Sequence, residues 1–267
     1  MSELNIGFIG GGNMAFAIAE GLTSSGKSHK KNIKICEIST ERKEFLRSKG
    51  YFVSDQLNSL ADCEIVFLAV KPAQASKVLK EFSALTASSS IVSIVAGLST
   101  KKLSEYTSCG VIRIMPNTPT LVNEGMFVIS EDFTASDTVL CTVTDLLSSI
   151  GKVSMSAPNL MDAVTAISGS GPAYVFMFID AMINAGVRLG LTRDQATELT
   201  LQTVKGATEM VSRSDRSPSD LKDMVCSPAG TTIEAVYELE KGGFNALIME
   251  AIKKCEEKSK ALSGENK

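Results

Sequence analysis

The stretch CSPAGTTIEA, from Cys226 to Ala235, places two adjacent threonines between a Ser-Pro-Ala-Gly turn and a helical pattern. The only histidine of the chain, His29, lies near the other end of the sequence and is expected at the surface. Reduction of a ketone forms an alkoxide, so the enzymes that catalyse it commonly use a histidine, lysine or tyrosine as proton donor. The stretch contains none of these residues. A reaction run here must depend on hydroxyls and backbone groups, unless the threonines are an ordinary helix N-cap.

A glycine-rich segment, GFIGGGNMAFAIAEGL, covers Gly7 to Leu22. It fits the pattern G-x-G-x-x-A, in which Gly10 permits a tight turn, Gly12 lets the backbone approach a pyrophosphate, and Ala15 lets helix and strand pack closely. The phosphates would lie at the N-terminus of the following helix, where free N–H groups and the helix dipole favour an anion. The strand expected before the motif and the helix expected after it favour dinucleotide binding over a purely structural glycine turn.

The carboxylate of Glu37 follows the second predicted strand, in KICEIST. A carboxylate at this place accepts hydrogen bonds from the adenosine ribose hydroxyls of NAD and repels the 2′-phosphate of NADP. Its distance from the glycines is somewhat longer than usual, and a solvated strand-end glutamate is the alternative. The basic residues Lys34 and Arg42 are near enough in sequence to offset the repulsion, which leaves both NADH and NADPH open.

Short β-branched runs alternate with helical patterns through the first half of the chain. This alternation predicts right-handed βαβ units and an α/β fold, a doubly wound parallel sheet with helices on both faces. After about Asn159 the strand signals stop, and helices separated by Gly, Ser and Pro follow. We therefore expect a Rossmann-like domain over residues 1–158 and an all-helical domain over residues 159–267. The predicted strands are Ile6–Ile9, Ile33–Cys36, Ile65–Val70, Ile91–Val95 and Val111–Met115.

The composition favours a small molecule as the ligand, rather than nucleic acid or a membrane. The net charge is −3, and the 27 basic residues are scattered among 30 acidic ones, so there is no basic footprint for nucleic acid and no polybasic patch. The six cysteines form no C-x-x-C pair, which argues against a zinc site or a disulfide framework. The first residues lack the basic region and cleavage site of a signal peptide. We expect reduced thiols, no metal and a cytoplasmic protein.

The most apolar run extends from Ala173 to Leu191. It predicts a helix from about Ala173 to Leu189, with Asp180 and Asn184 in one narrow polar stripe. These two residues and Arg188 disfavour a bilayer span. A helix that is apolar on nearly every side must be buried on nearly every side. A helical domain of about a hundred residues offers little cover of its own, so we expect a second copy of the chain to supply it. Cover by the first domain is the alternative.

Four motifs follow the glycine-rich opening, namely FLAVKP (Phe67–Pro72), MPNTP (Met115–Pro119), SGSGPAYVF (Ser168–Phe176) and SPAGTT (Ser227–Thr232). Together they resemble the pyrroline-5-carboxylate reductase family, over essentially the whole chain. The last two motifs are specific to that family, whereas many dehydrogenases share the opening. The resemblance implies reduction of L-1-pyrroline-5-carboxylate to L-proline by NADH or NADPH, the last step of proline biosynthesis. It also implies an intertwined homodimer built by the C-terminal helices, and dimers of this kind form higher oligomers in the family.

The resemblance implies cofactor contacts position by position. It places the choice between NADH and NADPH at Glu37 and closes the nicotinamide pocket with the loop of Asn117. An asparagine contact of the family aligns with Gln56, although Asn58 lies two residues on. A solvated loop lysine is the alternative for Lys71. The implied cofactor residues are Gly10, Gly12, Asn13, Met14, Glu37, Gln56, Ala69, Val70, Lys71, Pro72, Ile94, Val95, Ala96 and Asn117.

A cyclic imine also explains why no acid–base residue is needed. Its nitrogen carries the proton in the iminium form, so positioning against the nicotinamide is most of the task. Thr232 is the candidate catalytic residue, because a hydroxyl can hydrogen-bond the ring nitrogen. Backbone N–H groups from Gly230 onward and the Ser227 hydroxyl would bind the substrate carboxylate. Two adjacent threonines exceed what one N-cap requires, so a backbone contact is expected at Thr231.

Two further residues are candidates for substrate binding. Asp215 matches an acidic substrate-side residue of the family, in the irregular loop SRSDRSPSD. Ser170 lies in SGSGPAY, where proximity to substrate and a turn before Pro172 are equally open. Cys226 is interpreted as packing beside the site.

Two other functions remain open from the sequence. A hydroxyacid dehydrogenase of the 6-phosphogluconate type shares this two-domain plan, but the helix after SGSGPAY has no lysine where such an enzyme would place its base. A non-catalytic dinucleotide-binding relative would keep the binding motifs and act through interaction. Oxidation of the cofactor on addition of pyrroline-5-carboxylate separates these functions from an imine reductase.

Overall fold

The computed structural model describes residues 4–263, and its contacts divide the chain into two compact units. Among the described residues, unit 1 comprises residues 4–170 and 255–263, and unit 2 comprises residues 171–254. The boundary expected from sequence, after residue 158, precedes the division between the units by one short helical segment.

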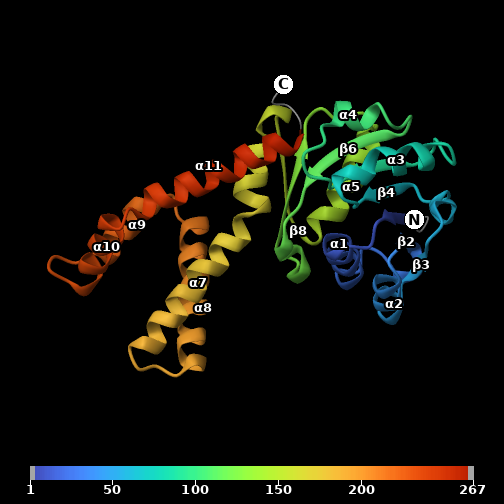
Figure 1. Ribbon diagram of the computed structural model, residues 1–267. Helices are drawn as coiled ribbons and strands as arrows, with labels where there is room; N and C mark the ends of the chain where they lie inside the picture. The colour runs from blue at the N-terminus through green and yellow to red at the C-terminus, as the bar shows by residue number, and fades with distance from the viewer. Residues whose placement is uncertain (1–3, 264–267) are drawn as a thin grey trace. The chain divides into compact units, whose positions relative to one another are not determined.

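Unit 1 is built on an eight-stranded sheet with the strand order β3-β2-β1-β4-β5-β6-β7-β8 (Figure 1). The order reverses on either side of β1, because β2 and β3 lie to one side and β4 to the other. In doubly wound sheets, ligands bind at the carboxyl ends of the strands where the order reverses. The strands are β1 (Ile6–Ile9), β2 (Ile33–Cys36), β3 (Phe52–Ser54), β4 (Ile65–Leu68), β5 (Ser90–Ser93), β6 (Gly110–Met115), β7 (Gly125–Ser130) and β8 (Gly151–Ser156).

The prediction of a parallel sheet is confirmed from β3 through β6, but it is wrong at the pair β6–β7, which is antiparallel. The connection between these strands holds only the short 3₁₀ helix η3 (Thr118–Val122). A parallel neighbour needs a crossover of about a dozen residues or more, usually a helix, so this short connection returns the chain in the opposite direction. Strand β8 then pairs in parallel with β7 after the helix α5 (Asp137–Ser148).

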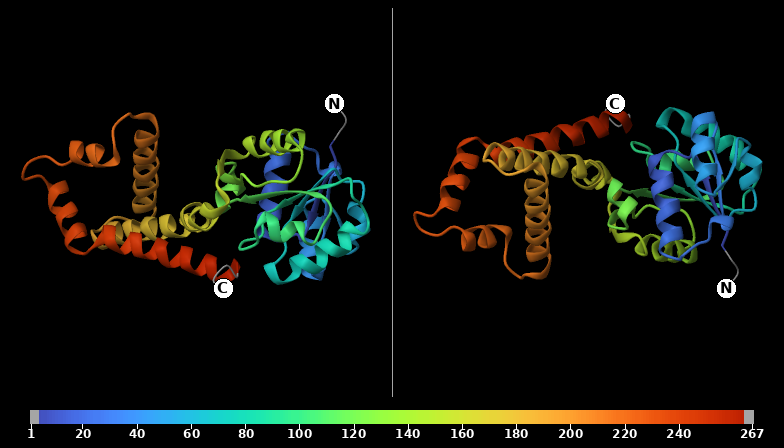
Figure 2. Two further views of the ribbon diagram at one scale, coloured as in Figure 1. Left: turned by 90° about the horizontal axis from the view of Figure 1, so that it is seen from above. Right: turned by 90° about the horizontal axis from the view of Figure 1, so that it is seen from below.

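Helices cover both faces of the sheet, as the sequence predicted (Figure 2). One face packs against α1 (Asn13–Ser24), α5 and Leu46 of α2 (Thr40–Ser48). The other face packs against α3 (Pro72–Ser83) and α4 (Thr100–Ser104). Neighbouring strand residues such as Phe8 and Ile9 point into opposite cores, which is why β1 and β4 are apolar at nearly every position.

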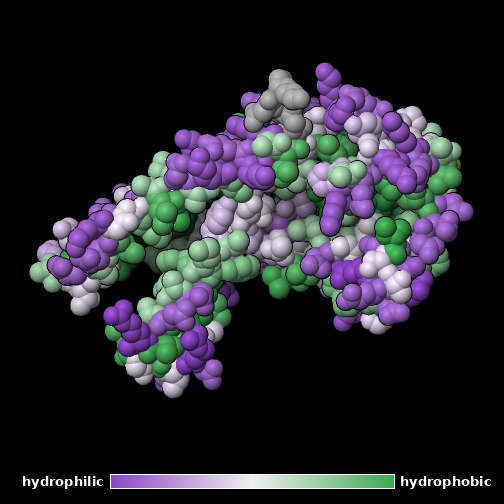
Figure 3. Space-filling view, viewed as in Figure 1, coloured by the Kyte–Doolittle hydropathy of each residue, from purple (hydrophilic) through white to green (hydrophobic). Residues whose placement is uncertain are grey.

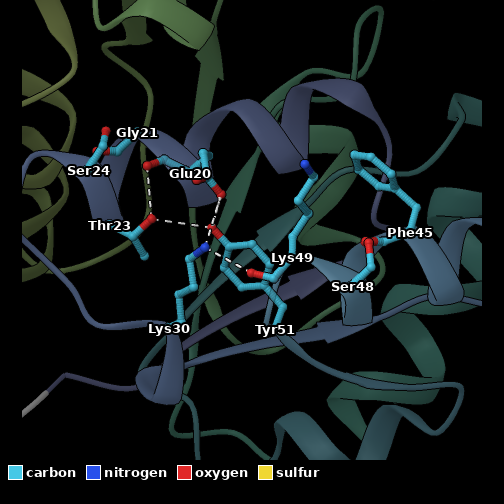
Figure 4. A network of polar contacts seen from close by, with 9 residues as sticks. All are labelled: Glu20, Gly21, Thr23, Ser24, Lys30, Phe45, Ser48, Lys49 and Tyr51. Atoms are coloured by element: carbon cyan, nitrogen blue, oxygen red, sulfur yellow. Dashed lines mark hydrogen bonds and ion pairs between the residues drawn. The ribbon is translucent and has the colours of Figure 1, made fainter.

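A buried tyrosine ties the C-terminal half of α1 to the segment before β3 (Figure 4). The Tyr51 hydroxyl donates to Oε2 of Glu20 at 2.8 Å and lies 3.3 Å from the Thr23 hydroxyl. The ammonium group of Lys30 lies 5.1 Å from the centre of the Tyr51 ring and donates to the Lys49 carbonyl at 2.8 Å. Burial raises the pKa of Tyr51, so the phenol stays protonated and keeps this bond. The network fixes α1, whose other end faces the carboxyl edge of the sheet.

The last part of unit 1 is helical. The 3₁₀ turn η4 (Pro158–Leu160) and α6 (Met161–Val164) lead into a π-helical turn, η5 (Thr165–Gly169). The final turns of α11 (Phe244–Ser263) pack onto this segment, because the buried Ser259 hydroxyl donates to Oδ1 of Asp162 at 2.5 Å. Neither Ser168 nor Ser170 forms the turn expected as an alternative, since both have helical backbone within a run that continues into α7 (Gly171–Arg188).

Unit 2 contains only helices, as expected: α7, α8 (Arg193–Arg213), α9 (Pro218–Val225), α10 (Thr231–Lys241) and the first half of α11. Helices α7 and α8 pack closely where an added Cβ on Gly186 would lie 2.9 Å from the Ala196 Cβ. The expected polar stripe is present, because Nδ2 of Asn184 donates to Asp180 at 2.9 Å and Arg193 donates to Asn184 at 3.2 Å.

No residue of α7 is buried within the single chain. The side chains of Phe176 and Met177 are 60% and 74% exposed. Figure 3 shows apolar residues over these helices. The sequence predicts that so apolar a helix is covered on nearly every side, and the chain alone leaves it uncovered.

Candidate active site

A cavity of about 570 Å³ opens at the carboxyl ends of β1, β2 and β4, where the strand order reverses. It brings together six of the predicted cofactor residues, Gly10, Gly12, Glu37, Ala69, Val70 and Lys71. Predicted residues that are far apart in the sequence therefore share one site.

The two glycines of the opening motif have different roles in the backbone. Gly10 has a φ of +94°, and an added Cβ would lie 2.6 Å from the Ala69 carbonyl oxygen, so a side chain there would strike the backbone after β4. Gly12 is the N-cap of α1 with extended backbone, and an added Cβ would meet nothing within 4 Å. This open space at a helix start is what a pyrophosphate requires.

The N-terminus of α1 has no side-chain cap and no acidic residue in its first turn. Its first N–H groups, including those of Asn13 and Met14, therefore remain available to an anion, and the helix dipole favours negative charge there. Ala15 is fully buried, as expected for the third small position of the motif.

The Glu37 carboxylate is already engaged by the backbone. Oε2 accepts from the Gly11 N–H at 2.8 Å, and Oε1 accepts from the N–H groups of Ile38 and Ser39, both at 2.8 Å. Glu37 therefore fixes the glycine loop as well as lining the cavity. Oε2 retains acceptor capacity for a ribose hydroxyl, because it accepts only one of these three bonds and a carboxylate oxygen has two lone pairs.

The two basic residues that could offset Glu37 lie in different environments. Lys34 donates to both carboxylate oxygens of Asp62, at 2.7 and 2.8 Å, and is thereby committed elsewhere. Arg42 donates through Nε to the Gly11 carbonyl, and its guanidinium lies 4.6 Å from the Phe45 ring centre. Its Nη2 is buried without a hydrogen-bond partner. Arg42 is thus the cation beside the Glu37 loop.

Several cavity residues were not anticipated from the sequence. Asp55 accepts from Lys43 at 3.0 Å, and this hydrogen bond lowers the pKa of Asp55. Burial raises the pKa of the Cys36 thiol to about 11, with the neighbouring carboxylates adding to the shift, so the thiol is neutral. The missed lining residues are Ile9, Cys36, Ile38, Asp55, Leu57, Ala73, Gln74, Lys77, Val78 and Glu81.

Two other predicted cofactor residues lie beside the cavity and do not line it. Gln56 is exposed and donates to Asp55 at 3.3 Å, while its neighbours Asp55 and Leu57 line the cavity. Pro72 is the first residue of α3, the position in which proline is best tolerated, and Lys71 is the N-cap.

The predicted nicotinamide side lies at the ends of β5 and β6. Val95 is buried in the core beneath α3, whereas Ile94 and Ala96 are partly buried. Ala96 packs in an apolar cluster with Met115 and Val164, which we call the β6-end cluster. An added Cβ on Gly169 would lie 3.3 Å from the Met115 sulfur, so the SGSG segment meets the end of β6.

The SPAGTT turn leads directly into α10. Gly230 is the N-cap, with no side-chain cap, so Thr231 and Thr232 are the first two residues of the helix. The alternative that one threonine is the N-cap is therefore wrong. Ala229 has a φ of +55°, and the Gly230 N–H donates to the Ser227 carbonyl at 3.0 Å. An added Cβ on Gly230 would displace the Ser227 hydroxyl from its present position.

The predicted substrate residues are divided between the units. Asp215, Ser227, Gly230 and the threonines belong to unit 2, and Ser170 belongs to unit 1. Asp215 is exposed between α8 and α9 and makes no hydrogen bond or ion pair within residues 4–263. The Ser170 hydroxyl lies 3.3 Å from the sulfur of Cys255. Within the described residues, no group of three or more histidine, cysteine or acidic side chains could hold a metal.

Residues 158–262 match the sequence family described as pyrroline-5-carboxylate reductase dimerisation, and residues 5–97 match the one described as NADP oxidoreductase, coenzyme F420-dependent. The pyrroline-5-carboxylate reductase of Escherichia coli (strain K12) is 41% identical over 98% of this chain and 99% of its own. The Arabidopsis thaliana pyrroline-5-carboxylate reductase is 39% identical over 98% and 96%. This chain belongs to the pyrroline-5-carboxylate reductase family.

The fold agrees with this membership. The crystal structure of Plasmodium falciparum pyrroline carboxylate reductase with NADP bound has a TM-score of 0.90 and 36% identity, covering 98% of this chain and 99% of the other. The resemblance carried by the motifs is therefore confirmed. So is the fold class, a Rossmann-like sheet followed by a helical dimerisation domain. The exposed face of α7 belongs to this dimerisation domain, so the chain forms a homo-oligomer.

The contrast between Gly12 and Gly10 gives a first prediction. Gly12→Ala should fold normally, because the new methyl group meets only open space, but it should raise the Kd for NADH by about tenfold or more by occupying the pyrophosphate position. Gly10→Ala should lower the unfolding free energy by about 1–3 kcal/mol, because of its positive φ and the Ala69 carbonyl. Cofactor fluorescence titration and thermal unfolding measure the two effects. If Gly12→Ala bound NADH with an unchanged Kd, the pyrophosphate would not lie at this helix start.

Proposed function

We propose that the protein is a pyrroline-5-carboxylate reductase, which reduces L-1-pyrroline-5-carboxylate to L-proline with NADH or NADPH as the last step of proline biosynthesis. The observation that carries the proposal is the uncapped SPAGTT helix start in a chain that matches this family over its whole length. Purified protein should oxidise NADH or NADPH when given the substrate, and should still do so after chelation of metals. A folded sample that binds NADH but gives no turnover with either cofactor would favour a non-catalytic relative.

The cofactor site fits a dinucleotide. The open space at Gly12 and the free N–H groups at the start of α1 suit a pyrophosphate, and the cavity beyond Glu37 suits the adenosine half. The bound cofactor supplies hydride. Residues Ile94 to Ala96 and the β6-end cluster would offer apolar surface to the nicotinamide ring and would keep water away from it. Functionally, we divide the chain into a cofactor domain of residues 1–158 and a substrate and dimerisation domain of residues 159–267.

The substrate carboxylate is assigned to the start of α10. With Gly230 as an N-cap that brings no side chain, the N–H groups of Thr231 and Thr232 lack any competing internal acceptor and can bind an anion. The Ser227 hydroxyl, held against Gly230, adds a donor. Ser170 and Asp215 remain proposed substrate contacts, the first through its hydroxyl and the second through its carboxylate.

Thr232 is assigned to the ring nitrogen. A threonine hydroxyl both donates and accepts, so it can orient the imine and then hydrogen-bond the product amine without changing its own charge. No proton donor is needed from the protein, because the iminium form brings its own proton. The second helical position frees the Thr232 side chain from the capping role, which leaves its hydroxyl available.

Assembly and location follow the same proposal. By length and composition, the helical run Pro158–Arg188 also meets a criterion for membrane-spanning helices, with a mean hydropathy of 1.3. It contains Asp180 and Arg188, which are costly in lipid. We assign its cover to a second copy of the chain, with no membrane, and place the protein in the cytoplasm. A higher oligomer of such dimers is compatible with the remaining apolar surface.

The Thr232 assignment predicts a separation of activity from stability. Thr232→Val keeps the shape but deletes the hydroxyl, and should lower kcat/KM by about tenfold or more, since one such contact is commonly worth about 1.5 kcal/mol. Its thermal unfolding should match wild type, because Gly230 is the N-cap. Thr232→Ser should keep much of the activity, and Thr231→Val serves as the neighbouring control. Normal kinetics in Thr232→Val would transfer the role to Thr231 or Ser227.

Glu37 predicts the cofactor preference. It should favour NADH over NADPH by repelling the 2′-phosphate, and Glu37→Ser should narrow the ratio of the two kcat/KM values. Because its carboxylate binds three backbone N–H groups, the same variant should also unfold at lower temperature. Activity assays with both cofactors and calorimetry measure these effects. An unchanged ratio would exclude Glu37 from contact with the adenosine ribose.

The exposed apolar face of α7 predicts how the mass of the oligomer changes when a charged side chain is introduced there. Wild type should scatter light with a mass at least twice the 28.4 kDa of one chain. Met177→Lys should lower this mass or unfold unit 2, because it places a charge on the uncovered face of α7. Leu85→Lys, an equally apolar-to-charged change at an exposed site of unit 1, should leave the mass unchanged. A monomeric wild type at micromolar concentration would contradict the dimer.

A further inference from the structure

The side chain of Asn117 has one polar group committed and the other without a partner. Its Oδ1 accepts from the Met126 N–H at 2.9 Å, while its carbonyl accepts from the hydroxyl and the N–H of Thr120, at 2.8 and 3.3 Å. Its Nδ2 makes no hydrogen bond within residues 4–263. Only the amide oxygen can accept from a backbone N–H, so the orientation of the amide is fixed. The group that remains is a donor, on a residue only 9% exposed.

The surroundings of Asn117 are those of the nicotinamide side. It directly follows Pro116 and Met115 at the carboxyl end of β6, and its partner Met126 packs on the β6-end cluster. It is also the N-cap of η3, which packs along the dinucleotide helix α1, where Nδ2 of Asn123 donates to the Ser24 hydroxyl at 3.3 Å. The donor is therefore held by elements that belong to the cofactor-binding sheet.

We infer that Asn117 Nδ2 is a fixed hydrogen-bond donor to the carboxamide oxygen of the nicotinamide, and so sets the rotation of the ring. This inference rests on the proposed function. The amide donor meets no acceptor of the described residues and keeps contact with solvent, so a ligand oxygen can take the place of water at this position. The apolar β6-end cluster suits the ring itself, and the carboxamide is the polar group attached to that ring. A substrate carboxylate is the other oxygen the donor could meet, and the experiment separates the two.

The decisive variant is Asn117→Asp. An aspartate can accept the Met126 N–H with one oxygen and presents a second oxygen where the amide had its donor, so the structural bond is kept and the donor is lost. Asn123→Asp is the matched control, because it adds the same charge at the other end of η3. Thermal unfolding of Asn117→Asp should stay close to that of Asn123→Asp.

Binding is measured without substrate, by the emission of the bound dihydropyridine, since the chain contains no tryptophan. Reduced thionicotinamide adenine dinucleotide, followed by its absorbance, serves as the second probe because sulfur is a weak acceptor. Wild type should prefer NADH to this analogue. In Asn117→Asp the Kd for NADH should rise about tenfold. The ratio of the Kd for the thio analogue to the Kd for NADH should fall toward one. The added negative charge raises the Kd of both cofactors by the same factor, so the ratio of the two Kd values reports the carboxamide contact alone.

An unchanged preference ratio in Asn117→Asp would overturn the inference. So would an unchanged Kd for NADH together with a raised KM for pyrroline-5-carboxylate, which would assign the donor to the substrate. If Asn117→Asp does not fold, the ratio of the two Kd values is measured on Asn117→Ser instead and tests the inference in the same way, because both variants lack the amide donor. Turnover of wild type with pyrroline-5-carboxylate is measured on the same preparations. Its absence would count against the proposed function, whereas the cofactor ratio tests Asn117 only.

Discussion

The close approach of Gly10 to the Ala69 carbonyl is the constraint on which the cofactor site depends. The chain leaves β1 with a positive φ at Gly10, and an added Cβ would lie 2.6 Å from that oxygen. This turn sends α1 away with its N-terminus at the carboxyl edge of the sheet, uncapped. Glu37 then fixes the loop from the other side by accepting the Gly11 N–H. The helix start, the carboxylate and the turn after β4 therefore meet because one glycine has no side chain.

The helical half obeys a different constraint. Its helices carry more apolar surface than one chain can cover, and even the central α7 has no buried residue. Hydrophobic burial is the main favourable term in folding, so much of the stability of these helices must come from association. The SPAGTT helix start lies among them, which links the conformation of the substrate residues to assembly.

The sequence predicted the parts that depend on local pattern. Strands β1 and β4 are continuous apolar runs, because both of their faces are buried, and they were recognised for that reason. Strand β2 was recognised from Ile33, Ile35 and Cys36, although Lys34 interrupts the run. Strand β3 has only three residues, and β8 has no fully buried residue, so neither shows that signal. Strand β7 was missed because no α-helix separates it from β6. The sequence analysis recognised strands by their alternation with helices, and this pair lacks that alternation. Contacts between distant residues, such as Gly11 with Glu37, leave no periodicity to detect. The sequence left open whether a threonine caps α10, and it does not, because Gly230 is the N-cap although a threonine is the commoner choice.

The π-helical turn at Thr165–Gly169 preserves an angular register. It holds one residue more per hydrogen-bonded ring than an α-helix, and each residue of an α-helix advances the side-chain direction by about 100°. A regular α-helical turn covers nearly the same rotation with one residue fewer, so the wide turn absorbs the extra residue and leaves the apolar face of α7 and the Asp180–Asn184 stripe in the directions they would have without it. Loss of one residue from this turn would therefore change its hydrogen bonds but leave the directions of the later side chains nearly unchanged. A change in length within α7 itself has no wide turn to absorb it, and it would rotate every later side chain by about 100° about the helix axis.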